Sequence, residues 1–381
     1  MNRLHALHDA GVSIWLDTLS RELLDSGEFA RLIADDAVTG ATSNPIIFAK
    51  AITGSDRYDD QLRAAVAAGM RDPQELFFEL ALDDVRRTAD LLRPTYDESE
   101  GRDGFVSFEC TPDLADDSEA TIEQALELWD RLARPNVMIK VPATESGVPA
   151  IEELTARGVN INVTLLFSVA RYEQVIDAYM SGLERRLAAG EPVDAIASVA
   201  SFFVSRVDAK VDPVLPAESR LRGRVAIANA RLAYARYLDR FSENACLTDV
   251  VRWLALRDAG AHAQRPLWAS TATKNPNYSD ILYVEKLIAR DAINTMPQAT
   301  LRAFADHGDL QHPLGVAGAA NATLRRARDA GIDLNAITAE LEREGVSSFC
   351  DSYHQLLDCI DTKRQATLRV SDGAPAERVS S

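Results

Sequence analysis

Cysteine and histidine are scarce in this chain of 381 residues, which has six histidines and four cysteines. The cysteines, at positions 110, 246, 350 and 359, form no C-x-x-C pair and have no histidine partner at the spacing of zinc ligands. A chain of this length can bury a large core without covalent crosslinks. We therefore expect the thiols to be reduced and structural.

Long apolar runs are also missing. No stretch approaches the roughly 18 consecutive apolar residues that a membrane-spanning helix needs. The first ten residues, MNRLHALHDA, lack the apolar segment of a secretory signal peptide. Both absences favour a cytoplasmic protein.

Positive charge is in deficit. The chain has 41 Lys and Arg against 58 Asp and Glu, a formal net charge of -17. This charge disfavours nucleic acid and anionic membrane surfaces as partners. If the substrate is an anion, a few local Arg or Lys residues must bind it against the overall field.

Short apolar or β-branched runs alternate with long amphipathic segments along the whole chain. Such an alternation predicts a parallel sheet, and eight repeats predict a closed (α/β)8 TIM barrel with additional helices. The eight predicted strands are Ser13–Asp17, Gly40–Asn44, Phe105–Glu109, Asn136–Pro142, Asn160–Leu165, Ala195–Ser201, Pro266–Ser270 and Ala292–Met296.

Helical periodicity fills the segments between these runs. No Pro-rich or Ser-rich linker divides the chain, so we expect residues 1–370 to form one barrel domain. The polar tail, residues 371–381, is expected to be disordered. The predicted helices are Leu19–Ile33, Pro73–Leu92, Ile122–Leu132, Ala150–Ala156, Val169–Ala188, a run within Pro216–Phe241, Tyr278–Ala289, and several between Leu301 and Ile360, among them Leu334–Leu341 and Ser347–Ile360.

Polar residues stand at the C-terminal ends of five successive predicted strands. They are Asp17, Asn44, Glu109, Lys140 and Thr164. Each has an ordinary explanation: a lysine can extend to solvent, an aspartate can cap a helix, and an asparagine can make a turn before proline. Because active sites of such barrels gather at the C-terminal ends of the strands, the five together favour one catalytic site.

These side chains suit chemistry on a ketone. A lysine in a dry pocket gives up its proton more easily, and the free amine forms a Schiff base that helps to break the adjacent C–C bond. Glu109 and Thr164 could supply the acid and the water relay for imine formation, and Asp17 could act as the base for cleavage. Asn44 could orient a polyhydroxylated fragment, as could Ser107 and Asn162, which share strand faces with Glu109 and Thr164.

Two later strands add groups that could bind phosphate. Ser201 and Arg206 follow the sixth strand, and Lys274 follows the seventh. An arginine beside a hydroxyl and backbone amides is a good phosphate ligand. The alternatives are an ion pair between Arg206 and Asp208, and an exposed loop position for Lys274.

With these residues, the sequence resembles the transaldolase family along nearly its whole length. The motifs are GATSNPIIF, VMIKVPAT, GVNINVTLLFS and SFFVSRVD, and the longer segment WASTATKNPNYSD is similar to a bacterial branch with extra segments. The resemblance implies a Schiff base on Lys140, acid–base catalysis by Asp17, and handling of the catalytic water by Glu109 and Thr164. It also implies dihydroxyacetone contacts from Asn44, Ser107 and Asn162, and phosphate contacts from Ser201 and Arg206. Lys274 stands where many members have a second phosphate-binding arginine, and a lysine there lacks the bidentate fork.

The implied reaction moves dihydroxyacetone from sedoheptulose 7-phosphate or fructose 6-phosphate to an aldose phosphate, glyceraldehyde 3-phosphate or erythrose 4-phosphate. This is a step of the non-oxidative pentose phosphate pathway. The resemblance implies sugar phosphate substrates and no metal or organic cofactor, and it leaves a monomer or a homodimer open. The role of the extra segments around Pro213–Ala259 is left open too.

Two other functions fit the same pattern. A fructose 6-phosphate aldolase shares the barrel and the lysine but releases free dihydroxyacetone. Phe203 favours transfer, because this position is usually Phe in the family's transferases and Tyr in its aldolases. A non-catalytic sugar-phosphate-binding barrel would have no need of the buried amine and its acids.

Overall fold

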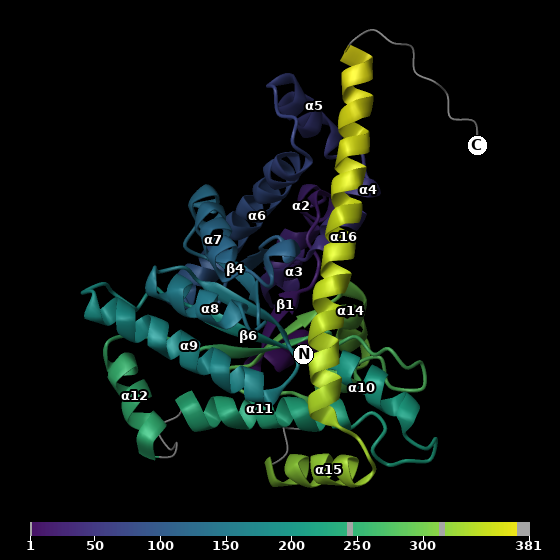
Figure 1. Cartoon of the computed structure of the whole chain (residues 1–381). Helices are drawn as coiled ribbons and strands as arrows, with labels where there is room; N and C mark the ends of the chain where they lie inside the picture. Colours follow the sequence, from purple (N-terminus) through teal and green to yellow (C-terminus); the bar gives the residue numbers. More distant parts are fainter. Residues whose placement is uncertain (1, 242–246, 312–316, 372–381) are drawn as a thin grey trace.

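The computed structural model describes residues 2–241, 247–311 and 317–371 (Figure 1). Within these ranges eight parallel strands close into a barrel in sequence order, with helices around it. This confirms the predicted (α/β)8 fold. The strands are β1 (Ser13–Leu16), β2 (Val38–Thr42), β3 (Val106–Glu109), β4 (Val137–Pro142), β5 (Ile161–Leu166), β6 (Ser198–Phe203), β7 (Arg265–Ala269) and β8 (Ile293–Met296).

Each predicted strand overlaps an observed one, and the ends differ by at most three residues. The helices are α1 (Arg3–Asp9), α2 (Arg21–Asp25), α3 (Glu28–Asp36), α4 (Pro45–Thr53), α5 (Asp59–Ala67), α6 (Pro73–Glu98), α7 (Ser118–Leu132), α8 (Gly147–Ala156), α9 (Val169–Ala188), α10 (Ser205–Val211), α11 (Val225–Phe241), α12 (Leu247–Asp258), α13 (Leu282–Lys286), α14 (Gln298–His307), α15 (Ala317–Asp329) and α16 (Leu334–Ser371), with short 3-10 helices at Pro112–Leu114 and Asp212–Val214.

The structure corrects three helix predictions, and one of them is Tyr278–Ala289, which is helical only over Leu282–Lys286. The segment Leu19–Ile33 is not one helix, because Gly27 takes a left-handed φ of 74° between α2 and α3. The predicted helices Leu334–Leu341 and Ser347–Ile360 are parts of the single helix α16, which runs through Gly345 without a break. The predicted tail beyond Ser371 and Cys246 lie outside the described residues.

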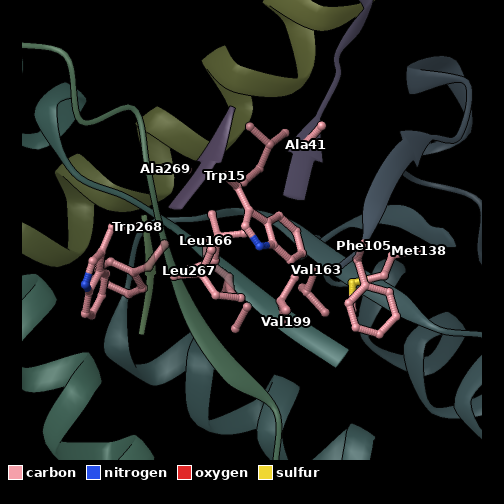
Figure 2. Close-up of a cluster of buried hydrophobic side chains, with 14 of the residues drawn as sticks. Trp15, Ala41, Phe105, Met138, Val163, Leu166, Val199, Leu267, Trp268 and Ala269 are labelled. Carbon is pink, nitrogen blue, oxygen red and sulfur yellow. The ribbon is translucent and has the colours of Figure 1, made fainter. Parts of the chain in front are cut away.

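Apolar side chains fill the N-terminal half of the barrel. Trp15 packs near Phe105, with ring centroids 6.5 Å apart, and Figure 2 shows Met138 next to Phe105. Gly40 makes room for this packing, since a Cβ there would lie 2.4 Å from the Trp15 indole nitrogen. Because side chains two apart in a strand share a face, the residues two positions after these three, Asp17, Ser107 and Lys140, point into the other half of the same interior.

Helix α16 is the longest element and runs the height of the molecule beside the barrel (Figure 1). It contacts α4, α5, α6, α10 and β5. No described helix is both long and apolar enough to cross a bilayer.

Candidate active site

A pocket of about 150 Å³ lies at the C-terminal ends of the strands. Eight of the eleven residues predicted for the site line it, which are Asp17, Asn44, Lys140, Thr164, Ser201, Phe203, Arg206 and Lys274. Glu109 reaches it through a bond to Lys140, while Ser107 and Asn162 are fully buried and are not among the lining residues. The strand ends therefore bring together residues that are far apart in sequence.

Lys140 does not extend to solvent, because the residue is only 5 % exposed. Its Nζ donates a hydrogen bond to the carbonyl oxygen of Ser43 at 2.9 Å and lies 3.3 Å from Glu109 Oε2. The strand register explains the pairing, since Lys140 lies directly beside Glu109 of β3 and Asn162 of β5. The amine is thus held inside the barrel next to an acid.

Burial raises the pKa of the Glu109 carboxyl. The positive charge of Lys140 and its hydrogen bond act in the opposite direction, and the negative charge of Asp17 adds to the rise. A carboxyl group with a raised pKa can hold a proton and donate it, which is what a general acid must do.

Asp17 directly follows β1, lines the same pocket and is partly exposed. One carboxylate oxygen accepts a hydrogen bond from the Thr42 hydroxyl at 3.1 Å. The surrounding protein raises the pKa of Asp17, although Lys140 and the Thr42 hydroxyl lower it. The aspartate is not a helix cap, since Ser20 caps α2. Its carboxylate therefore remains available to a substrate.

Thr164 offers a hydroxyl with no protein partner. Its Oγ1 is buried and accepts or donates no hydrogen bond within the described residues. Buried polar atoms are almost always paired, so such an atom facing a pocket suits a ligand or a water molecule.

Beneath the pocket, three polar side chains form a chain of hydrogen bonds. The Ser201 hydroxyl donates to Asn162 Oδ1 at 2.7 Å, and Asn162 Nδ2 donates to Ser107 Oγ at 2.9 Å. In this arrangement Asn162 and Ser107 hold Ser201 in place. Asn44 combines two roles, because it lines the pocket and its Oδ1 caps α4 by accepting from the Ile47 N–H at 3.1 Å.

Two cations stand at the edge of the pocket. Arg206 lies over the Phe203 ring, 5.3 Å from its centroid, and Lys274 lines the same pocket. Within the described part of the chain, neither has a carboxylate at ion-pair distance. Asp208 does not pair with Arg206, because it accepts hydrogen bonds from the Ala226 N–H and the Tyr283 hydroxyl instead. Both cations are available to an anion.

A larger pocket, about 640 Å³, opens at the opposite end of the barrel. Its most central cation, Arg265, is already bound to the Ser13 hydroxyl and to the carbonyl oxygens of Arg102 and Asp291. The smaller pocket has the buried amine of Lys140 near the carboxylates of Asp17 and Glu109, and the larger pocket has no such combination among its lining residues. Among the described residues, no group of three or more His, Cys, Asp or Glu side chains could hold a metal ion.

A family model described as transaldolase/fructose-6-phosphate aldolase matches residues 14–360. The chain belongs to this family. Transaldolases from three bacteria are similar along nearly their whole length. The relative from Saccharopolyspora erythraea is 49 % identical over 364 residues, covering 94 % of this chain and 97 % of the relative. Those from Thermobifida fusca and Mycobacterium bovis are 48 % and 47 % identical, covering 93 % of this chain and 96 % and 95 % of the relatives.

Eight of the sixteen lining residues of this transaldolase-family chain were not predicted as site residues from the sequence, and three of these, Thr42, Thr295 and Phe349, bear on the chemistry. Thr42 shares a strand face with Asn44, so its position could have been inferred. Thr295 belongs to β8 and lies within hydrogen-bonding distance of Thr42, 2.8 Å between hydroxyl oxygens. Phe349 comes from α16, and no strand pattern points to it. The described residues between 213 and 259 do not line this pocket, and α11 and α12 pack against α9 instead.

Proposed function

We propose that this protein is a transaldolase that transfers dihydroxyacetone from sedoheptulose 7-phosphate or fructose 6-phosphate to glyceraldehyde 3-phosphate or erythrose 4-phosphate. The observation that supports it most is the buried Lys140 amine, 3.3 Å from Glu109 in a pocket that also contains Asp17. The transaldolase relatives, at 47–49 % identity over nearly the full chain, support the same activity.

Schiff-base formation is the first step of the proposed mechanism. The Lys140 amine must be neutral to attack the C2 carbonyl of the ketose phosphate, and Glu109, with its raised pKa, can hold the proton. The resulting carbinolamine loses its hydroxyl as water when Glu109 protonates it, and the unpartnered hydroxyl of Thr164 can position that water.

Cleavage and transfer follow. Asp17 takes the proton from the C4 hydroxyl, the C3–C4 bond breaks, and its electrons pass to the iminium nitrogen to give an enamine. The aldose phosphate leaves, an acceptor aldehyde enters, and the same steps run in reverse. Arg206 and Lys274 would bind the phosphate at the pocket edge, where both cations have no described carboxylate partner.

Trapping of the intermediate tests this proposal. Borohydride added with fructose 6-phosphate should reduce the Schiff base to a stable adduct on Lys140, located by peptide mass spectrometry. Lys140→Ala should give no adduct and should abolish turnover, while Lys274→Ala, the second lysine of the pocket, should still be labelled at Lys140. Unmodified wild-type protein, or Lys140→Ala activity within roughly tenfold of wild type, would contradict the proposal.

A fructose 6-phosphate aldolase, the alternative function, would differ from a transaldolase in releasing free dihydroxyacetone. It predicts free dihydroxyacetone at a rate comparable with transfer, whereas a transaldolase keeps the fragment bound until an acceptor arrives. Phe203 in the pocket wall supports transfer. A non-catalytic sugar-phosphate-binding barrel predicts no adduct at all.

Three other expectations stay predictions. They are a single domain over residues 1–370, a cytoplasmic location, and an oligomeric state that is either a monomer or a homodimer. The three described cysteines are free thiols.

A further inference from the structure

Helix α16 contributes one residue, Phe349, to the pocket at the strand ends. The other lining residues lie on the strands or within a few positions of their C-terminal ends. Phe349 follows the last strand by more than fifty positions in the chain, and it is only 4 % exposed. An apolar ring thus closes one side of a pocket whose remaining wall is largely polar.

Ion pairs hold α16 against the barrel on both sides of Phe349. Before it in the sequence, Lys210 of α10 binds Glu340 at 2.7 Å and Glu344 at 2.5 Å. After it, Lys363 binds Asp59 at 2.7 Å. Because α10 also carries Arg206, the helix is tied to an element that itself lines the pocket.

Helix α16 makes a close contact with β5 at the residue that follows Thr164. At Gly345, a Cβ atom would lie 2.9 Å from the Leu165 side chain, so only glycine fits here without a shift. Leu165 follows Thr164 and has a left-handed φ of 57°. Residues four apart on a helix share a face, so Phe349 lies one turn further along the side of α16 that faces Leu165.

This position bears on the fate of the three-carbon intermediate, an argument that rests on the proposed transaldolase function. After the aldose phosphate leaves, the enamine on Lys140 can attack an acceptor aldehyde, which is transfer. Alternatively, it takes a proton on carbon from the acid that Asp17 has become. Water then adds to C2 of the iminium ion, and the carbinolamine expels the Lys140 amine to release dihydroxyacetone.

We propose that Phe349 keeps water from relaying a proton to the enamine carbon and so commits this enzyme to transfer rather than release of dihydroxyacetone. An aromatic ring offers water no hydrogen-bond partner of ordinary strength. Removing it would open space in the pocket that Thr164 also lines, and the Thr164 hydroxyl has no described partner. A cavity holds water when it is roomy enough and offers polar partners, and Thr164 would supply one.

The test compares two rates in the full-length protein. Free dihydroxyacetone is measured with fructose 6-phosphate alone, and transfer is measured with excess erythrose 4-phosphate. Phe349→Ala should raise the ratio of release to transfer by roughly tenfold or more, while Phe349→Leu, which keeps an apolar side chain, should stay within about threefold of wild type. A general loss of structure would lower both rates together and leave the ratio unchanged.

The outcomes separate the two proposals. If the wild type performs neither reaction, the proposed function is wrong. If the wild type performs transfer and Phe349→Ala leaves the ratio unchanged, the role of Phe349 is wrong. Should Phe349→Ala not fold, Phe349→Val makes a smaller truncation, and an unchanged ratio in that variant overturns the inference equally.

Discussion

The hydrogen bond from the Thr42 hydroxyl to the Asp17 carboxylate influences the pKa of Asp17, the proposed base. Replacing the hydroxyl of Thr42 should therefore change that pKa. The Thr42 hydroxyl has a single proton, and it donates to Asp17 at 3.1 Å. Its 2.8 Å contact with the Thr295 hydroxyl must then be one in which Thr295 donates. Thr42→Val replaces the hydroxyl by a methyl group of similar shape and removes the bond to the carboxylate.

The size of the effect follows from the strength of such bonds. A hydrogen bond to a charged group contributes about 1.5–3 kcal/mol, and one pKa unit corresponds to about 1.4 kcal/mol. Because Asp17 is partly exposed to the pocket, we expect the lower end, about 1 unit. The bond stabilises the ionised form, so its loss raises the pKa of Asp17. Asp17 must be ionised to accept the substrate proton, so the acidic limb of the activity profile should move to higher pH.

The assay is kcat/KM for fructose 6-phosphate with an acceptor between about pH 5 and pH 9, where free-enzyme groups determine the profile. Thr42→Ser keeps the hydroxyl and serves as the control, with a limb close to that of the wild type. The reasoning is refuted if the acidic limbs of Thr42→Val and wild type superimpose.

Three further predictions concern phosphate binding, pH-dependent stability and packing. Arg206→Ala should raise KM mainly for phosphorylated substrates, because the guanidinium has no described carboxylate partner; an unchanged KM would move the phosphate site elsewhere. Burial raises the pKa of Asp208 to about 7, well above the ordinary value, so the stability from this group is present at low pH and is lost as pH rises toward 7. The unfolding free energy of the wild type relative to Asp208→Asn, measured in denaturant, should therefore fall between about pH 4 and pH 7 by up to about 1.4 kcal/mol per pH unit, and a constant difference would contradict the shift. Gly147→Ala should destabilise the fold by about 1–3 kcal/mol in denaturant unfolding, because its Cβ would lie 1.9 Å from the Pro142 carbonyl oxygen at the end of β4; an unchanged midpoint would show that α8 moves freely.

The sequence alone determined the barrel and half of the residues that line the pocket. Short apolar runs predict the strands, and a parallel barrel places the C-terminal ends of all strands at one rim. Polar residues such as Lys140 and Asp17, each at the end of such a run, could therefore be assigned to one site without coordinates. Their spacing within a strand also fixed which neighbours share the interior face.

Only the tertiary structure decided which groups contact each other. The Thr42–Thr295 pair joins residues that are 253 positions apart, and no local pattern encodes such a contact. The same holds for Arg206, because its alternative partner, Asp208, binds Ala226 and Tyr283 instead. Phe349 enters the pocket because α16 packs on β5 through Gly345, and helical periodicity in the sequence says that a face is buried but not which part of the molecule buries it.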